Sequence, residues 1–122
     1  MRVDSLMHQG NALPLVPPKM SIPEVLVQMS SKGFGLVGLV ENNKLIGVIS
    51  DGDLRRNMAG LMAAQAEDIA NDSPVTITPD APAATAVRTM NSHQITGLFV
   101  IDKDNVPIGI VHLHDCLRAG VA

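Results

Sequence analysis

The sequence of 122 residues contains one pattern twice, and this internal repeat restricts the possible folds more than any other feature. Identical residues recur at a nearly constant offset. The pairs 61 residues apart are Pro18 and Pro79, Met29 and Met90, and Ser31 and Ser92, and those 62 residues apart are Gly47 and Gly109, Asp53 and Asp115, and Arg56 and Arg118. The offset changes by one residue within a predicted hairpin turn, where an insertion costs least. We infer one structural unit that is used twice.

Each half predicts the order short strand, helix, strand, strand, helix. In the first half the prolines of segment 13–18 keep it extended. The helix that follows begins with a capping box, in which Ser21 is the N-cap and Glu24 the N3 residue, and it ends at Lys32-Gly33. Its apolar residues recur with the spacing of one buried helix face: Ile22, Val25, Leu26 and Met29.

Two short apolar strands follow in each half and are joined by a turn. In the first half they are 34–40 and 44–50, and Asn42 and Asn43 suit the left-handed backbone of a tight hairpin. A second helix should run from Asp51 to about Ala59. The second half predicts an extended segment at 75–79, a helix capped by Asp80 with the face Ala83, Ala86, Val87 and Met90, strands at 97–101 and 106–111, and a final helix at 114–119.

The fold class that follows is α/β, in the mixed α+β sense, with two βαββα repeats. We place the first repeat, with a short helical lead-in, at residues 1–62 and the second at 63–122. A unit of about 60 residues buries so little surface that it is only marginally stable alone. The strands are apolar on both faces and need cover on both sides. We therefore expect the repeats to pack together as a pseudo-twofold pair.

Composition excludes several classes of partner. The net charge is −3 and the only adjacent basic residues are Arg55 and Arg56, so a nucleic-acid partner lacks its electrostatic footprint. Trp and Tyr are absent, which removes base-stacking platforms. No apolar run approaches the length that spans a membrane, and the single cysteine suits a reducing compartment. We expect a cytoplasmic protein without a nucleic-acid or membrane partner.

Polar side chains gather where the last strand of the first half meets the following helix. Ser50 and Asp53 lie there beside backbone N–H groups that favour an anion, and a carboxylate one turn into a helix can accept sugar hydroxyls. The same residues also have a purely structural explanation, with Ser50 or Asp51 as the N-cap and Asp53 complementing the helix dipole. From the residues alone both interpretations stay open.

The duplicated βαββα unit, with Gly-x-x-Ser-x-x-Asp at the end of its third strand, resembles the CBS domain pair, named after cystathionine β-synthase and also called the Bateman module. Three stretches, 6–10, 50–56 and 113–121, also resemble the C-terminal CBS tail of bacterial arabinose 5-phosphate isomerases. This resemblance implies that a sugar-isomerase domain precedes the chain in the full-length protein. Such enzymes supply arabinose 5-phosphate for Kdo, the acidic sugar of lipopolysaccharide and some capsules.

By this resemblance the chain is a regulatory, ligand-sensing module and is not itself an enzyme, since nothing in it forms a catalytic set. A nucleotide-bearing ligand would bind in the cleft between the repeats and modulate the attached isomerase domain. The ligand would be an adenine nucleotide (AMP or ATP) or CMP-Kdo, the activated product of the pathway, and no cofactor is required. CBS pairs often form flat dimers, which implies a homodimer. The alternative is a ligand-free structural dimerisation module.

The resemblance also assigns ligand contacts to individual positions. Ser50 would contact a phosphate, and Asp53 would contact ribose hydroxyls. In the second repeat Asp115 is kept, but His112 stands where Ser or Thr is usual. We therefore do not expect the two repeats to bind ligand equally.

Three more candidate ligand residues have structural alternatives. Gly47, like its counterpart Gly109, would let a ligand or a neighbouring backbone approach the strand closely, and the structural alternative is a small residue at a crowded sheet crossing. Arg55 and Arg56 would bind an acidic ligand group, remain solvated or pair across a subunit interface.

The histidines and the cysteine indicate neither a metal nor a nucleophile. His8, His112, His114 and Asp115 match no metal-binding motif, so no metal is expected. Cys116 lies on an apolar helix without an identifiable base partner, and we interpret it as a core residue.

Overall fold

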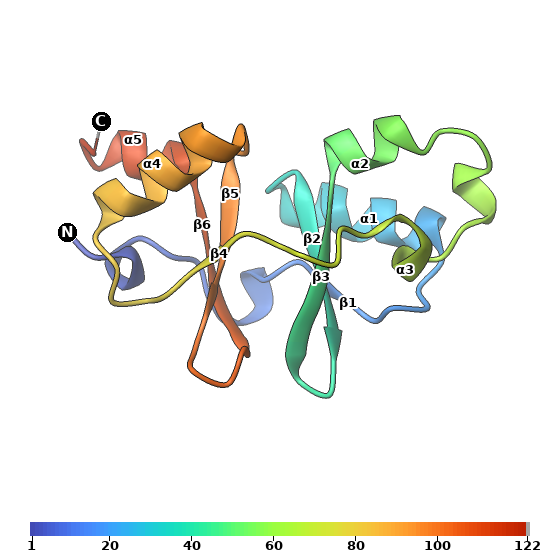
Figure 1. Ribbon diagram of the computed structural model, residues 1–122, viewed down its shortest axis with the longest axis horizontal. Helices are drawn as coiled ribbons and strands as arrows, with labels where there is room; N and C mark the ends of the chain where they lie inside the picture. Colours follow the sequence, from blue (N-terminus) through green and yellow to red (C-terminus); the bar gives the residue numbers. More distant parts are fainter. Residues whose placement is uncertain (122) are drawn as a thin grey trace. The chain divides into compact units, whose positions relative to one another are not determined.

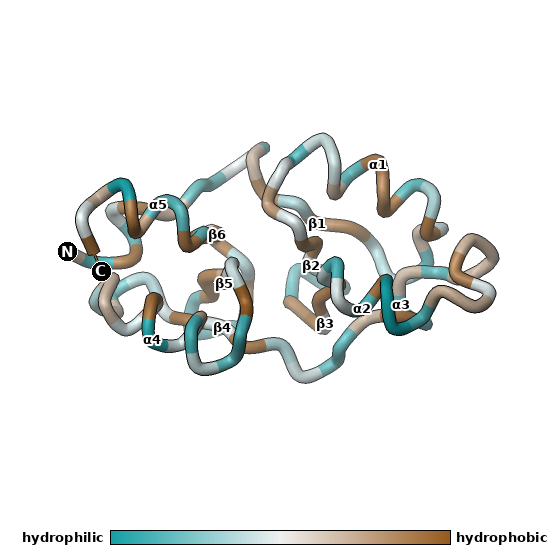
Figure 2. The backbone as a smooth tube through the Cα atoms, turned by 90° about the horizontal axis from the view of Figure 1, so that it is seen from above, coloured by the Kyte–Doolittle hydropathy of each residue, from teal (hydrophilic) through white to brown (hydrophobic). Residues whose placement is uncertain are grey.

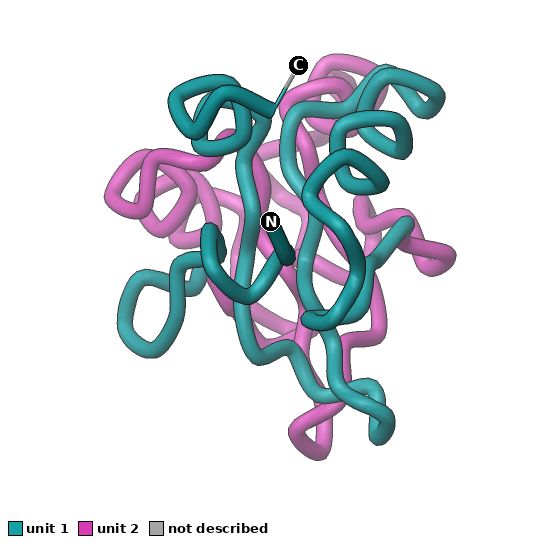
Figure 3. The backbone as a smooth tube through the Cα atoms, turned by 90° about the vertical axis from the view of Figure 1, so that its left-hand side faces the viewer, with its two compact units in different colours: residues 1–13, 75–122 teal, residues 14–74 magenta. Residues whose placement is uncertain are grey.

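The computed structural model describes residues 1–121 and forms two compact units, which Figure 3 shows in different colours. One unit, here called the split unit, combines Met1–Leu13 with Val75–Ala122. The other, the central unit, is Pro14–Pro74. Each unit contains one three-stranded sheet and its helices. The mixed α/β fold class predicted from the sequence is confirmed.

The central unit has the predicted order of strands and helices (Figure 1). Its elements are β1 (Leu15–Val16), α1 (Ile22–Lys32), β2 (Leu36–Glu41), β3 (Lys44–Ser50), α2 (Asp51–Arg56), the 3-10 helix η3 (Leu61–Ala63) and α3 (Ala66–Ile69). The sheet order is β1-β2-β3, with β1 parallel to β2 and β2 antiparallel to β3. Helix α2 begins directly where β3 ends, which places the Ser50 region at a strand-to-helix junction.

The split unit repeats this plan. Its elements are the 3-10 helices η1 (Val3–Ser5) and η2 (Gly10–Ala12), followed by β4 (Thr76–Ile77), α4 (Ala83–His93), β5 (Gly97–Ile101), β6 (Pro107–His112) and α5 (Leu113–Arg118). Leu36 pairs with Ser50 in one sheet, and Gly97 pairs with His112 in the other. The strand before the turn is therefore offset by 61 residues and the strand after it by 62. The inserted residue lies in the hairpin turn, as predicted.

The boundaries of the compact units differ from the sequence boundaries of the repeats at 1–62 and 63–122. The lead-in of the first repeat packs in the split unit, where His8 forms an isolated bridge with Ile110 of β6. The lead-in of the second repeat packs in the central unit, where Asn71 forms the matching bridge with Val48 of β3. Each set of core strands is therefore completed by a lead-in from the other half of the sequence.

Two predicted helix boundaries are wrong. Helix α2 ends at Arg56 and not near Ala59, because Asn57 adopts a non-helical backbone and its side-chain amide donates to the Asp53 carbonyl at 2.7 Å. Helix α4 has Pro82 as its N-cap residue, without a side-chain cap, so Asp80 is not the cap. By contrast, Ser21 does cap α1.

Each unit has its own apolar core, and Figure 2 shows hydrophobic stretches along the strands of each. The predicted helix faces are buried, including Met29 of α1 and Met90 of α4. The central core consists of Val16, Ile22, Val25, Met29, Val37, Leu39, Ile49, Leu54, Leu61 and Ala66, and the split core of Val3, Ile77, Ala86, Val87, Met90, Leu98, Val100, Val111 and Cys116. Among the described residues no helix has both the length and the hydropathy needed to cross a membrane.

Candidate ligand site at two strand-to-helix junctions

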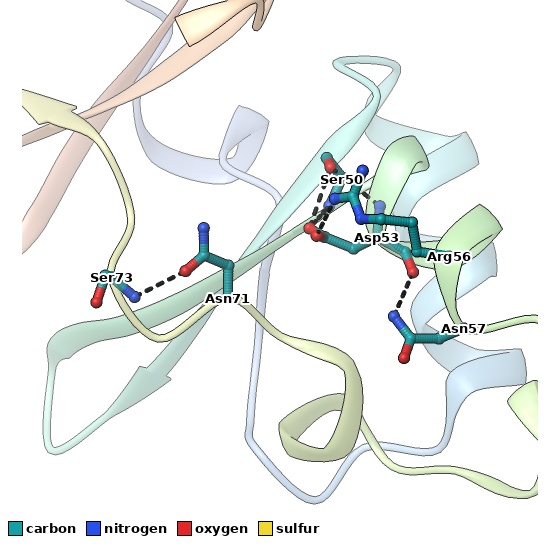
Figure 4. A network of polar contacts seen from close by, with 6 residues as sticks. All are labelled: Ser50, Asp53, Arg56, Asn57, Asn71 and Ser73. Atoms are coloured by element: carbon teal, nitrogen blue, oxygen red, sulfur yellow. Dashed lines mark hydrogen bonds and ion pairs between the residues drawn. The ribbon is translucent and has the colours of Figure 1, made fainter.

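In the central unit, Ser50 and Asp53 form a capping box at the start of α2 (Figure 4). The backbone N–H of Ser50 donates to Asp53 Oδ2 at 2.9 Å, and its hydroxyl donates to the same oxygen at 3.0 Å. The Asp53 N–H points back to the Ser50 hydroxyl at 3.4 Å. The two candidate residues therefore lie together and also cap the helix, so the structural explanation is correct. It does not remove the ligand-binding one, because a hydroxyl can turn by one rotamer without moving the backbone.

The two arginines of this junction differ in their contacts. Arg56 donates from Nη2 to Asp53 Oδ1 at 2.7 Å, an ion pair one helical turn apart. Arg55 is exposed and forms no ion pair with any residue that the structure describes. Arg56 therefore orients the Asp53 carboxylate, whereas the guanidinium of Arg55 extends into solvent.

The junction of the split unit repeats the capping box with different chemistry. The N–H of His112 donates to Asp115 Oδ2 at 3.0 Å, and Arg118 donates to Asp115 Oδ1 at 2.6 Å. The Nδ1 atom of His112 accepts from the N–H of His114 at 3.1 Å. An imidazole thus caps α5, where a hydroxyl caps α2.

The lead-in supplies one further contact to this junction that the sequence did not predict. His8 Nε2 lies 2.9 Å from Asp115 Oδ2, although the two residues are 107 positions apart. Two backbone hydrogen bonds hold His8 in place, from its N–H to the Ile110 carbonyl at 2.8 Å and from the Ile110 N–H to its carbonyl at 3.0 Å. In the central unit Asn71 occupies the matching position, and its side chain accepts from the Ser73 N–H and is turned away from Asp53 (Figure 4).

Burial and neighbouring charges change the ionisation of the split-unit junction. Burial alone would raise the pKa of the Asp115 carboxyl, but hydrogen bonds from His8 and from the His112 N–H, with the charges of His8 and Arg118, hold that pKa below its ordinary value. The pKa of His112 is also lowered, first by burial and then by the neighbouring His114. Asp115 therefore stays ionised, and the neutral imidazole of His112 is favoured.

The two candidate glycines lie where a lead-in crosses the strand. A Cβ atom at Gly47 would lie 3.0 Å from the Asn71 carbonyl oxygen and 3.4 Å from the Ala70 Cβ. A Cβ at Gly109 would overlap the side chain of Met7. Close approach of the protein's own chain accounts for both glycines, which was the structural alternative given for them.

The remaining chemical candidates are structural. Among the described residues no group of three His, Cys, Asp or Glu side chains could hold a metal ion. Cys116 is completely buried in the split core, and its pKa is raised by burial and by the Asp115 charge. Cys116 is therefore a core residue, as predicted.

The repeated βαββα units, each ending in an acidic capping box after its third strand, define the class of tandem α/β modules known as CBS pairs. The family model described as "CBS domain" matches the chain twice, at residues 3–60 and 66–122. The chain belongs to the CBS domain family.

Curated relatives of similar sequence are longer enzymes. The chain is 37% identical to arabinose 5-phosphate isomerase KdsD of Pseudomonas aeruginosa and 35% identical to KdsD of Yersinia pestis, in each case over 99% of this chain and 38% of the relative. The chain therefore spans about two-fifths of the length of these relatives.

Solved structures with the same fold are known at low sequence identity. The CBS domain pair of protein MJ0100, in complex with 5′-methylthioadenosine and S-adenosyl-L-methionine, has a TM-score of 0.86 at 21% identity and covers 98% of this chain and 95% of that one. The CBS domain protein PAE2072 from Pyrobaculum aerophilum, complexed with AMP, has a TM-score of 0.85 at 24% identity and covers 99% and 95%. These likenesses establish the CBS pair fold.

Proposed function

We propose that this chain is a regulatory CBS pair that binds a nucleotide through the Ser50–Asp53 junction. The observation that carries the proposal is the pairing of the rotatable Ser50 hydroxyl with the Asp53 carboxylate at the N-terminal end of α2. The hydroxyl can donate a hydrogen bond to a phosphate. The side chain of Asp53 is 14% exposed, and its carboxylate can accept hydrogen bonds from ribose hydroxyls. Nucleosides or nucleotides bound to CBS pairs of the same fold support this assignment.

The two junctions should differ in their use of ligand. Asp53 receives its third hydrogen bond from a hydroxyl that can turn away, whereas Asp115 receives it from His8, which the backbone anchors. We therefore assign the stronger binding to the central unit, with His112 and Asp115 as the weaker site.

The ligand is proposed in two forms, an adenine nucleotide such as AMP or ATP, or the sugar nucleotide CMP-Kdo. The exposed Arg55 supports an acidic ligand group, because its guanidinium has no carboxylate partner among the described residues. CMP-Kdo carries a carboxylate that AMP lacks, and as a downstream product of the isomerase pathway it would be a suitable feedback signal.

A regulatory module acts on an enzymatic activity, and we propose that activity from the curated relatives. The KdsD isomerases are more than twice the length of the matched region, so we propose that the full-length protein is a cytoplasmic arabinose 5-phosphate isomerase. This chain would form a homodimer and would carry no catalytic residue of its own. A ligand with different affinity for two states of the enzyme would shift the balance between them.

The second candidate function is a ligand-free dimerisation module. Its supporting observation is that the residues of both junctions form the capping boxes of α2 and α5, so they have a sufficient structural role. This function predicts a dimer that nucleotides do not affect.

Calorimetric titration with AMP, ATP, CMP and CMP-Kdo separates the two functions. We expect saturable binding below about 1 mM for one of these ligands, and Asp53→Asn should weaken it at least about tenfold, since it removes charged hydrogen bonds to ribose. Asp68→Asn is the matched control, because Asp68 is also the N3 residue of a capping box in the central unit, with its carboxylate accepting from the Gln65 N–H at 2.9 Å. Lack of binding by all four ligands would favour the dimerisation module.

A further inference from the structure

The helix α5 is capped by a group that can take up a proton near neutral pH. The Nδ1 atom of His112 accepts the hydrogen bond from the His114 N–H at 3.1 Å. Ser50 holds the corresponding place before α2, and its hydroxyl does not titrate in this range. The caps of the two junctions therefore differ in their response to protons.

Protonation of His112 at Nδ1 would reverse the role of the capping atom. A ring nitrogen accepts a hydrogen bond only through its lone pair, and once protonated it is a donor that faces another donor, the His114 N–H. The new charge would also lie at the N-terminal end of α5, where the helix dipole disfavours cations. The neutral ring thus stabilises the first turn of α5, and the charged ring destabilises it.

The surroundings of His112 contain more basic than acidic groups. The His114 ring lies at a tilt beside it with a ring-centroid distance of 4.5 Å, Arg118 lies one turn further on, and His8 approaches from the lead-in. Among the residues that the structure describes, the one acidic group that acts on His112 is Asp115, which already accepts from His8 and Arg118. Strand β5, which pairs with β6, carries no titratable side chain, and the titratable side chains of α4, which packs on α5, are Arg88 and His93.

We propose that the His112 cap makes the split unit pH-responsive: α5 is capped while the ring is neutral, and its first turn loosens when the ring is protonated. The effect should extend to the lead-in, because Asp115 in this turn also holds His8. This inference does not depend on nucleotide binding.

The direction of the pH dependence follows from proton linkage. Because the pKa of His112 is lowered in the folded state, the unfolded chain binds the proton more readily. The stability that the neutral cap provides is therefore complete above the ordinary imidazole pKa of about 6.5, and it is lost as the pH falls through the lower value of the folded state.

Two measurements test this inference. The ring nitrogens of His112, followed by NMR from about pH 8 to about pH 5, should show an unprotonated Nδ1 at the alkaline end. The melting temperature of the wild-type protein should decrease as the pH falls over this range. In His112→Ser, which copies the Ser50 cap, the larger part of this decrease should disappear.

The matched control is His93→Gln, which removes an exposed histidine at the end of α4 in the same unit. This variant should keep the wild-type pH dependence. Three results would overturn the inference. They are a proton on Nδ1 of His112 at the alkaline end, a His112→Ser variant that keeps the full pH dependence of the wild type, and a His93→Gln variant that loses as much of the pH dependence as His112→Ser. If His112→Ser folds poorly, the ring titration of the wild-type protein still decides.

Discussion

Single residues show how the same position can serve different chemistry in the two units. Asp53 and Asp115 both accept from the backbone N–H three residues earlier and from an arginine three residues later. The difference lies in the capping side chain, a hydroxyl in Ser50 and an imidazole in His112. The internal repeat identified these residues, but only the structure shows that each aspartate is itself part of a cap.

At Gly109 we predict a steric effect of one methyl group. Gly109→Ala would place a Cβ against the Sδ and Cγ atoms of Met7 and 3.1 Å from the Met7 Cβ. Rotating the flexible end of the Met7 side chain would therefore not relieve all of the close contacts. We expect a loss of about 1–3 kcal/mol in the free energy of unfolding, the usual range for overpacking.

The double variant Gly109→Ala with Met7→Ala tests the cause of this loss. It should be more stable than the sum of the two single variants predicts, because Met7→Ala removes Sδ and Cγ, the two Met7 atoms nearest to the new Cβ. Urea unfolding of the four proteins measures this coupling. Strict additivity would show that the strain at Gly109 does not come from Met7.

At the scale of secondary-structure elements, local sequence signals predicted the structure correctly where it depends on the backbone preferences of single residues. Asn42 and Asn43 have φ values of 54° and 66°, so they form the predicted left-handed hairpin turn, and β3 has the predicted bounds. The end of α2 was not predictable, because it depends on the side chain of Asn57 reaching the Asp53 carbonyl. Helix ends are decided by such single contacts more than by propensity.

The hairpin turn gives a prediction at this scale. Asn43→Ala should destabilise the central unit by about 1 kcal/mol, because a Cβ-bearing residue other than Asn or Asp is disfavoured at positive φ. Asn43→Gly should be within about 0.5 kcal/mol of the wild type or slightly more stable. Chemical denaturation measures both values, with the exposed Glu41→Ala as a control at the end of the adjoining strand β2. Equal effects of the two alanine variants would contradict the role of backbone conformation.

At the scale of the whole molecule, the exchange of lead-ins makes the split unit depend on a segment distant in sequence. Val3 is completely buried in the split core, and the other buried residues of that core lie beyond residue 75 in the sequence. The first thirteen residues are thus part of the fold of the C-terminal half. Any domain that precedes this chain would be joined to the split unit through this lead-in.

Truncating Val3 should therefore weaken the C-terminal half of the sequence. We expect Val3→Ala to cost about 2 kcal/mol, from two buried methyl groups and the cavity that they leave. Hydrogen exchange should show lost protection in residues 75–121 and unchanged protection in the central unit. Val27→Ala is the matched control, since this valine is 69% exposed on α1. Loss of protection confined to residues near Val3 in sequence would contradict the exchanged lead-ins.

The sequence by itself determined the repeat, the βαββα order, the hairpin turns, the buried helix faces and the residues of both junctions. These features depend on local backbone preferences and on periodic burial, and both follow from the types of residues that are close together in the sequence. The tertiary structure alone decided which unit each lead-in joins, that Gly47 and Gly109 accommodate the chain itself, and that His8 binds Asp115 across 107 positions. Such contacts depend on how distant segments meet in space, and no local pattern in either segment specifies its partner.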